Sequence, residues 1–263
     1  PAALTVTAGT TTSNALTITP AADGIVEQDE TFSITLTTPP TPDPAGGGAG
    51  ETWAAGGNQT VAVTIQSDDQ YSITVTPASD SETEDSGSPI EFTVTLSNPV
   101  AWDVDVPFTL TPTHANLTGS DYTLDTSSPV TFTSGGPLTQ VIQVTPQNDD
   151  IVEEDETFDI TTGTPSPSTD WDTVSPAAVE GTIQSEDQYS ITITPATDSE
   201  SEDSGNPIEF TVTLSNAVDW DIDVPFTLTP THANLTGADY TLDTSSPVTF
   251  TSGGPLTQVI QVT

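Results

Sequence analysis

Apolar and polar residues alternate with a period of two along most of this chain. A period of two places every second side chain on one face, as in a β-strand with one face in a core and one in water. Clusters of Gly, Pro, Ser, Asp and Asn separate the alternating segments. The pattern predicts strands over Tyr71–Thr76, Ile90–Leu96, Trp102–Leu110, Val130–Thr133, Leu138–Thr145, Thr157–Thr161 and Val179–Ile183.

These predicted strands indicate the class of fold. No stretch shows the 3.6-residue period of a helix, and about seven short strands fall within roughly 120 residues. Such spacing is typical of two antiparallel sheets packed face to face. We therefore expect an all-β protein made of immunoglobulin-like sandwiches.

A tandem repeat determines the domain organisation. Residues 71–145 return as 189–263 with eight substitutions in 75 positions, among them Ala101 to Asp219. We expect the later strands of one unit in 1–69, a complete unit in 70–187 and the earlier strands of the next in 188–263, as in a window cut from a longer repeat protein. The junctions at 67–70 and 185–188 lack a flexible linker, which favours a stiff rod.

The charge of the chain limits the classes of partner that it can bind. It has 39 Asp and Glu residues, no Lys or Arg, and a formal net charge of −39. Such a polyanion lacks the Lys and Arg that neutralise phosphates, so we expect no nucleic-acid partner. Anionic lipid should repel it, and no apolar run is long enough to insert into a membrane. Its carboxylates need water, backbone N–H groups or cations as partners.

The acidic residues gather in the turns between predicted strands. Alternate loops of a sandwich emerge at the same end, so carboxylates distant in sequence can meet there. Packed without partners they would repel each other, whereas Ca²⁺ takes six to eight oxygen ligands. We expect neither zinc nor copper, because no His or Cys accompanies these residues in sequence. The alternative is a solvated acidic surface, with Asp155 and Glu156 capping a strand.

Three motifs in a fixed order carry a family resemblance. They are GSDY (119–122), NDDIVEEDETF (148–158) and TIQSED (182–187), with VTFTSGG…QVIQV between the first two. In this order they resemble the Calx-beta repeat, an immunoglobulin-like sandwich found in sodium–calcium exchangers, integrin β4 and large bacterial surface proteins. The resemblance implies tandem Calx-beta-like sandwiches in a large prokaryotic surface or filament protein.

The resemblance also implies a set of calcium ligands at one tip of each sandwich. In this chain the corresponding residues are Glu84, Asp121, Asp149, Asp150, Glu153, Glu186 and Asp187 in the complete unit, Asp23, Glu27, Asp68 and Asp69 before it, and Glu202 and Asp239 after it. Asn148 and Gly24 stand where a calcium-rich member has a further Asp, and Glu186 replaces the Asp found at position 68. Fewer charged ligands imply weaker binding or fewer ions per tip.

The expected function is structural and non-enzymatic. A near-identical unit suits a stiff extracellular extender or fibre body, with calcium bracing tips and junctions. One alternative is an adhesive module that binds a cell-surface ligand through the Gly-rich insertion Ala45–Gly57, which contains Trp53. Another is a filament subunit whose partial sandwiches complete each other between chains. Carboxylate pairs repeated on turns, rather than set in a cleft, do not favour glycoside hydrolysis.

Three smaller signals remain open. The sequons place candidate glycosylation sites at Asn58, Asn116 and Asn234. His114 and His232 occupy the same loop in two copies, with no nucleophile motif nearby, which favours an ordinary surface role. Trp102 and Trp220 fit a core or sheet-edge position better than a sugar platform.

Overall fold

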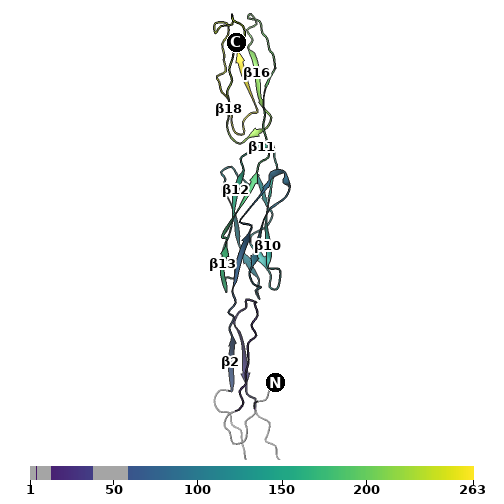
Figure 1. The fold of residues 1–263 in the computed structure, drawn as a ribbon, viewed down its shortest axis with the longest axis vertical. Helices are drawn as coiled ribbons and strands as arrows, with labels where there is room; N and C mark the ends of the chain where they lie inside the picture. The colour runs from purple at the N-terminus through teal and green to yellow at the C-terminus, as the bar shows by residue number, and fades with distance from the viewer. Residues whose placement is uncertain (1–3, 5–12, 38–58) are drawn as a thin grey trace, which may run out of the picture.

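Three stacked β-units make up the chain, arranged along one long axis (Figure 1). The computed structural model describes residues 4, 13–37 and 59–263. We refer to 13–69, 70–187 and 188–263 as the first, central and third units. The insertion with Trp53 and the sequon at Asn58 lie outside the described residues.

Helix is nearly absent from the part of the chain that the structure describes. One turn of 3-10 helix, η1 (Glu84–Ser86), is the exception there. Nothing among the described residues therefore forms a helix long and apolar enough to cross a membrane.

The central unit is a sandwich of two main sheets. One has the strand order β13-β3-β5-β10-β8 and the other β4-β14-β12-β7, with a separate pair, β6-β9. Its strands are β3 (Tyr71–Thr76), β4 (Ser79–Thr83), β5 (Ile90–Leu96), β6 (Val104–Val106), β7 (Phe108–Pro112), β8 (Tyr122–Leu124), β9 (Val130–Phe132), β10 (Thr139–Pro146), β12 (Glu156–Thr162), β13 (Trp171–Ser175) and β14 (Ala178–Gln184). The all-β sandwich class is confirmed.

The apolar face of each strand fills one core. On β5 the positions Ile90, Phe92, Val94 and Leu96 are buried and alternate with more exposed residues, as a period of two requires. β12 contributes Phe158 and Ile160 from the opposite sheet. Trp102 is half-buried against this core, as expected, and Trp220 lies likewise against the core of the third unit.

The predicted strand Trp102–Leu110 is wrong in one respect. The segment forms two strands, because Pro107 lies between β6, which pairs with β9, and β7, which pairs with β12. Proline has no N–H group to donate to a sheet, so the chain changes partner there. Two pairings, β13 with β3 and β14 with β4, are parallel in an otherwise mainly antiparallel arrangement.

The described parts of the first and third units contain fewer strands. The first has the hairpin β1 (Glu30–Thr35) and β2 (Thr60–Ile65). The strands of the third are β15 (Ile191–Thr194), β16 (Ile208–Leu214), β17 (Ala217–Val218), β18 (Ile222–Val224), β19 (Val248–Phe250) and β20 (Thr257–Val262). A short strand of the central unit, β11 (Ile151–Val152), pairs in parallel with β17 and joins the two units.

Candidate metal centre

Glu84 reaches the pole of the central unit from the end of β4. The strand runs parallel to β14 and stops at η1, which closes at Gly87 with a φ of 64°, a conformation that favours glycine. The Thr83 hydroxyl donates to the Asp85 carboxylate at 2.7 Å and holds that side chain in the turn. The Glu84 side chain is only 5% exposed.

Two further carboxylates arrive from different loops. Asp149 lies between β10 and β11, and its Oδ1 accepts the backbone N–H of Ile151 at 2.7 Å. Asp187 follows β14, and its Oδ2 is buried without a hydrogen-bond donor. One oxygen from each of Glu84, Asp149 and Asp187 lies within 4.8 Å of the others. Oxygens that each sit about 2.4 Å from a shared Ca²⁺ are at most this far apart.

Without a cation, the negative charges of these three carboxylates, which we call the trio, repel one another. Burial, followed by the charges of Glu153, Glu186, Asp149 and Asp187, raises the pKa of Glu84 to about 8. Burial also raises the pKa of Asp187, with contributions from Asp150, Asp149 and Asp85. The chain has no Lys or Arg, so a bound cation would supply the positive charge that favours the ionised form of Glu84 and Asp187.

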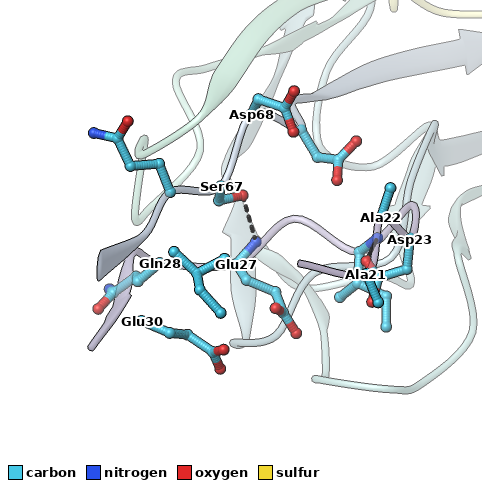
Figure 2. Close-up of a pocket in the computed structure, with 12 residues that line it drawn as sticks. Ala21, Ala22, Asp23, Glu27, Gln28, Glu30, Ser67 and Asp68 are labelled. Atoms are coloured by element: carbon cyan, nitrogen blue, oxygen red, sulfur yellow. Dashed lines mark hydrogen bonds between the residues drawn. The ribbon is translucent and has the colours of Figure 1, made fainter. Parts of the chain in front are cut away.

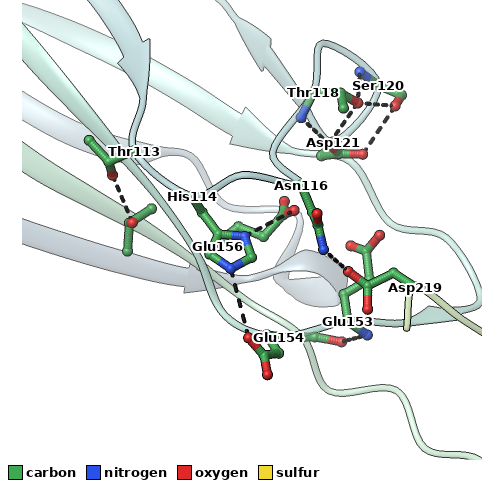
Figure 3. A network of polar contacts seen from close by, with 12 residues as sticks. Thr113, His114, Asn116, Thr118, Ser120, Asp121, Glu153, Glu154, Glu156 and Asp219 are labelled. Carbon is green, nitrogen blue, oxygen red and sulfur yellow. Dashed lines mark hydrogen bonds and ion pairs between the residues drawn. The ribbon is translucent and has the colours of Figure 1, made fainter. Parts of the chain in front are cut away.

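Figure 3 shows a second acidic group, which contains Asp121, Glu153 and Glu156. Burial and the charges of Asp121, Asp149 and Asp219 together raise the pKa of Glu153 and of Glu156 to about 7, and the charge of Glu156 adds to the shift of Glu153. Asp121 is held by its own turn, where the Thr118 N–H and hydroxyl and the Ser120 hydroxyl donate to it. We call Glu84, Asp121, Asp149, Asp150, Glu153, Glu156, Glu186 and Asp187 the acidic pole.

The position of His114 corrects the expectation that no histidine accompanies the acidic residues. Its ring lies 3.8 Å from a carboxylate oxygen of Glu154 and 3.8 Å from one of Glu156. A histidine therefore does accompany the acidic residues in space, although none does in sequence. The trio itself remains all-oxygen, the donor set that suits a hard cation such as Ca²⁺ rather than zinc or copper.

The seven carboxylates predicted in the central unit lie at one pole. Glu84, Asp149 and Asp187 form the trio, and the charges of Asp150, Glu153 and Glu186 raise the pKa of its members. Asp121 acts on Glu153. Their role as ligands stays a prediction.

Two acidic residues of this region were missed. Glu156 is 2% exposed. Its position signals this, because Glu156, Phe158 and Ile160 share the buried face of β12. Asp219 comes from the third unit, and its substitution for Ala101 in the otherwise repeated sequence was the available signal.

The first unit repeats part of the pole. Asp23, Glu27, Asp68 and Asp69 line one pocket of about 280 Å³ together with Glu30 (Figure 2). The local hydrogen bonds are those of the central unit: Ile25 N–H donates to Asp23 at 3.0 Å, and Glu27 N–H donates to Ser67 at 3.4 Å. Residues 1–22 contain no Asp or Glu.

The third unit places its two predicted ligands in another pocket. Glu202 and Asp239 line a pocket of about 360 Å³. Hydrogen bonds from the Thr236 N–H and hydroxyl, both 2.8 Å long, lower the pKa of Asp239. Glu202 is exposed, unlike its counterpart Glu84. Among the described residues, the trio of the central unit is the one group of three or more acidic or histidine side chains whose ligand atoms all lie within 4.8 Å of one another.

The two described sequons differ in their surroundings. Asn116 and Asn234 are both exposed. Asn116, however, donates a hydrogen bond from Nδ2 to Asp219, so the atom to which a glycan would be attached already has a partner. Glycosylation itself stays a prediction.

Comparisons with known proteins agree with the repeat pattern. The family model described as "Calx-beta domain" matches residues 1–69 and 66–187. No curated protein matches the chain.

Solved structures give distant similarities. The apo form of the Calx CBD1 domain is 18% identical with a TM-score of 0.38, over 45% of this chain and 100% of that one. The CBD12 pair of CALX1.2 is 18% identical with a TM-score of 0.37, over 73% of each chain. "Calcium binding domain CBD12 of CALX1.1" is 16% identical with a TM-score of 0.37, over 72% of this chain and 74% of that one.

Proposed function

Because this chain belongs to the Calx-beta domain family, we propose that it is a non-enzymatic, calcium-braced segment of an extracellular repeat protein. The observation that carries the proposal is the trio, in which a buried Glu84 faces Asp149 and Asp187 without any basic residue. Glu84, Asp149 and Asp187 would hold the ion, with Asp150, Glu153 and Glu186 beside them. Calcium would supply the positive charge that the sequence lacks.

Linkage gives calcium its mechanical role. An ion that binds only the folded state stabilises it by RT ln(1 + [L]/Kd), about 2.7 kcal/mol at a hundredfold excess over Kd. Calcium outside cells reaches the range of weak sites of the extracellular type. Because the pole lies beside β11, which joins the central and third units, neutralising it would also stiffen the rod.

Calorimetric titration with CaCl₂ and thermal melting in calcium or EDTA test this proposal on the full chain. We expect the wild-type protein to bind calcium and to melt at a lower temperature in EDTA. The double substitution Glu84→Gln with Asp149→Asn should abolish binding at the trio. Asp172→Asn removes an exposed carboxylate on β13 and is the matched control. Equal melting in calcium and EDTA would remove the ion from the mechanism.

A second candidate function is filament formation by mutual completion of the partial units. In the third unit Ile193 is 55% exposed and borders an apolar pocket with Phe210 and Phe226. The hairpin of the first unit carries Phe32 and Ile34, the counterparts of the core residues Phe158 and Ile160. One chain's hairpin could thus occupy the third unit of another.

Sedimentation distinguishes the two candidates. A self-completing subunit would form concentration-dependent polymers, and Phe32→Asp would prevent them. If the chain acts only as a spacer, the wild-type protein and Phe32→Asp should both sediment as monomers. The adhesive alternative rests on the 45–57 insertion, which lies outside the described residues.

A further inference from the structure

At the junction between the central and third units, Asp219 of the third unit reaches the acidic pole of the central unit. β11 of the central unit pairs in parallel with β17 of the third, and the Asp219 N–H donates to the Val152 carbonyl at 3.3 Å. The preceding junction has the same backbone plan, since Val26 bridges Val100 and the Ala101 N–H donates to the Val26 carbonyl at 3.0 Å. Asp219 and Ala101 therefore occupy equivalent places, one with a carboxylate and one without.

The carboxylate of Asp219 points into the central unit. Its Oδ2 accepts the hydrogen bond from Asn116 Nδ2, and its Oδ1 is buried without a donor (Figure 3). A buried carboxylate oxygen that lacks a donor is costly, and close to other carboxylates it is costlier. One side of Asp219 is thus satisfied by the protein, while the other is free to meet a cation.

An independent observation points to a ligand at the same place. Glu156 is 2% exposed, and neither of its carboxylate oxygens accepts a hydrogen bond. The nearest cationic candidate, Nδ1 of His114, is 3.8 Å away and also lacks a hydrogen-bond partner. The charge of Asp219 raises the pKa of both Glu156 and Glu153, so the three carboxylates share one electrostatic environment.

We propose that Asp219 is a calcium ligand donated across the junction, where it completes, with Glu153 and Glu156, a cation site shared by two units. The proposal rests on the proposed calcium function. It adds Asp219, a residue of the third unit, to the acidic pole of the central unit. The oxygens of these residues are not all within the 4.8 Å that unites the trio. An ion bound by all three residues would require these oxygens to move closer together, and we expect that movement to tighten the junction between the central and third units.

The repeat itself supplies matched variants. Asp219→Ala makes the second junction like the first, and Ala101→Asp makes the first like the second. Asp219→Asn keeps an acceptor for Asn116 but removes the charge. A residue that acted only as a hydrogen-bond partner would tolerate Asn, whereas a calcium ligand would not.

Calorimetric titration of the full chain with CaCl₂ gives the number and affinity of sites. We expect Asp219→Ala and Asp219→Asn each to lose one cation site, or to weaken it by roughly tenfold, because calcium affinity depends on the count of charged ligands. Glu84→Gln should weaken the trio and leave the Asp219-dependent site in place. Since the chain has no cysteine, spin labels on engineered cysteines flanking the junction should show a calcium-dependent narrowing of distances that Asp219→Asn removes.

The outcomes separate this inference from the function on which it rests. If the wild-type chain binds no calcium, the proposed function fails. If it binds calcium, loses binding with Glu84→Gln, and keeps unchanged sites and distances with Asp219→Asn, the shared site alone is overturned. Added affinity at the first junction in Ala101→Asp would support the inference a second time.

Discussion

At the scale of one residue, Glu84 shows how burial and neighbouring negative charges favour the binding of a cation. Its carboxylate lies at the end of β4, nearly without exposure, facing two other carboxylates. Its exact surroundings could not be read from sequence, since they depend on which loops meet in space. Glu156 is different, because it shares the buried face of β12 with Phe158 and Ile160, and the period-two alternation of this strand was a sequence signal that went unused.

The pH dependence of stability follows from the raised pKa of Glu84. The folded, calcium-free protein holds a proton on Glu84 up to about pH 8, whereas the unfolded chain releases it near pH 4.3. Stability is therefore gained as pH falls through 8 and is fully present below the unfolded pKa. In EDTA we expect a higher melting temperature at about pH 6 than at about pH 9, by scanning calorimetry.

Two comparisons check this expectation. Glu84→Gln cannot titrate, so its melting temperature should change less over the same range. Excess calcium should reverse the trend, because the ion needs ionised ligands and stabilises more as pH rises. An identical pH slope in Glu84→Gln would show that Glu84 is not the responsible group.

Gly181 provides a second prediction at this scale. It lies on β14 opposite Phe158, and an added Cβ would come within 2.1 Å of that ring. Phe158 is fully buried, so the ring must shift within a packed core. We expect Gly181→Ala to cost about 1–3 kcal/mol of unfolding free energy, as overpacking does.

Denaturant unfolding measures that cost, and Gly119→Ala is its control. A Cβ at Gly119 meets nothing within 4 Å, and no positive φ is recorded there. The control should therefore unfold like the wild type. Equal stability of the two variants would contradict the packing described for β12 and β14.

At the scale of elements, hydrophobic alternation predicted the apolar strands well and the polar ones poorly. β3 and β5 have the predicted bounds. β4, with the sequence SDSET, carries no apolar alternation and is held by parallel pairing with β14. Such pairing is a long-range contact that a local pattern does not contain. The division at Pro107 was visible in sequence, because a proline inside a predicted strand marks an edge or a break.

The junction elements carry the third prediction. Val26 of the first unit is fully buried in the core of the central unit and bridges Val100. Burying such a side chain contributes about 1.5–3 kcal/mol. We expect Val26→Ser to speed hydrogen exchange at the amides of Val26 and Ala101, which bond across this junction, and to leave Ile142 in β10 protected.

Val61→Ser is the matched control for that experiment. Val61 lies on β2 and is 53% exposed, so its loss should not reach the junction. If Val26→Ser left both junction amides as protected as in the wild type, the buried valine would not be what couples the units.

At the scale of the whole molecule, the units lie end to end and meet through short parallel pairings (Figure 1). The family resemblance predicted which loops carry the pole. It did not predict that a loop of the next unit reaches that pole, because contacts between units are not encoded in the motif of either one. Because all its charged side chains other than histidine carry one sign, we propose that this arrangement depends on counter-charge at its poles and junctions.

A crystal structure determined in the presence of calcium, with anomalous scattering from the ion, tests the central claim most directly. The account predicts a peak among Glu84, Asp149 and Asp187, with carboxylate oxygens at about 2.3–2.6 Å. A map at full calcium occupancy of the solution sites with no peak there, and with the three carboxylates turned apart into solvent, would contradict it.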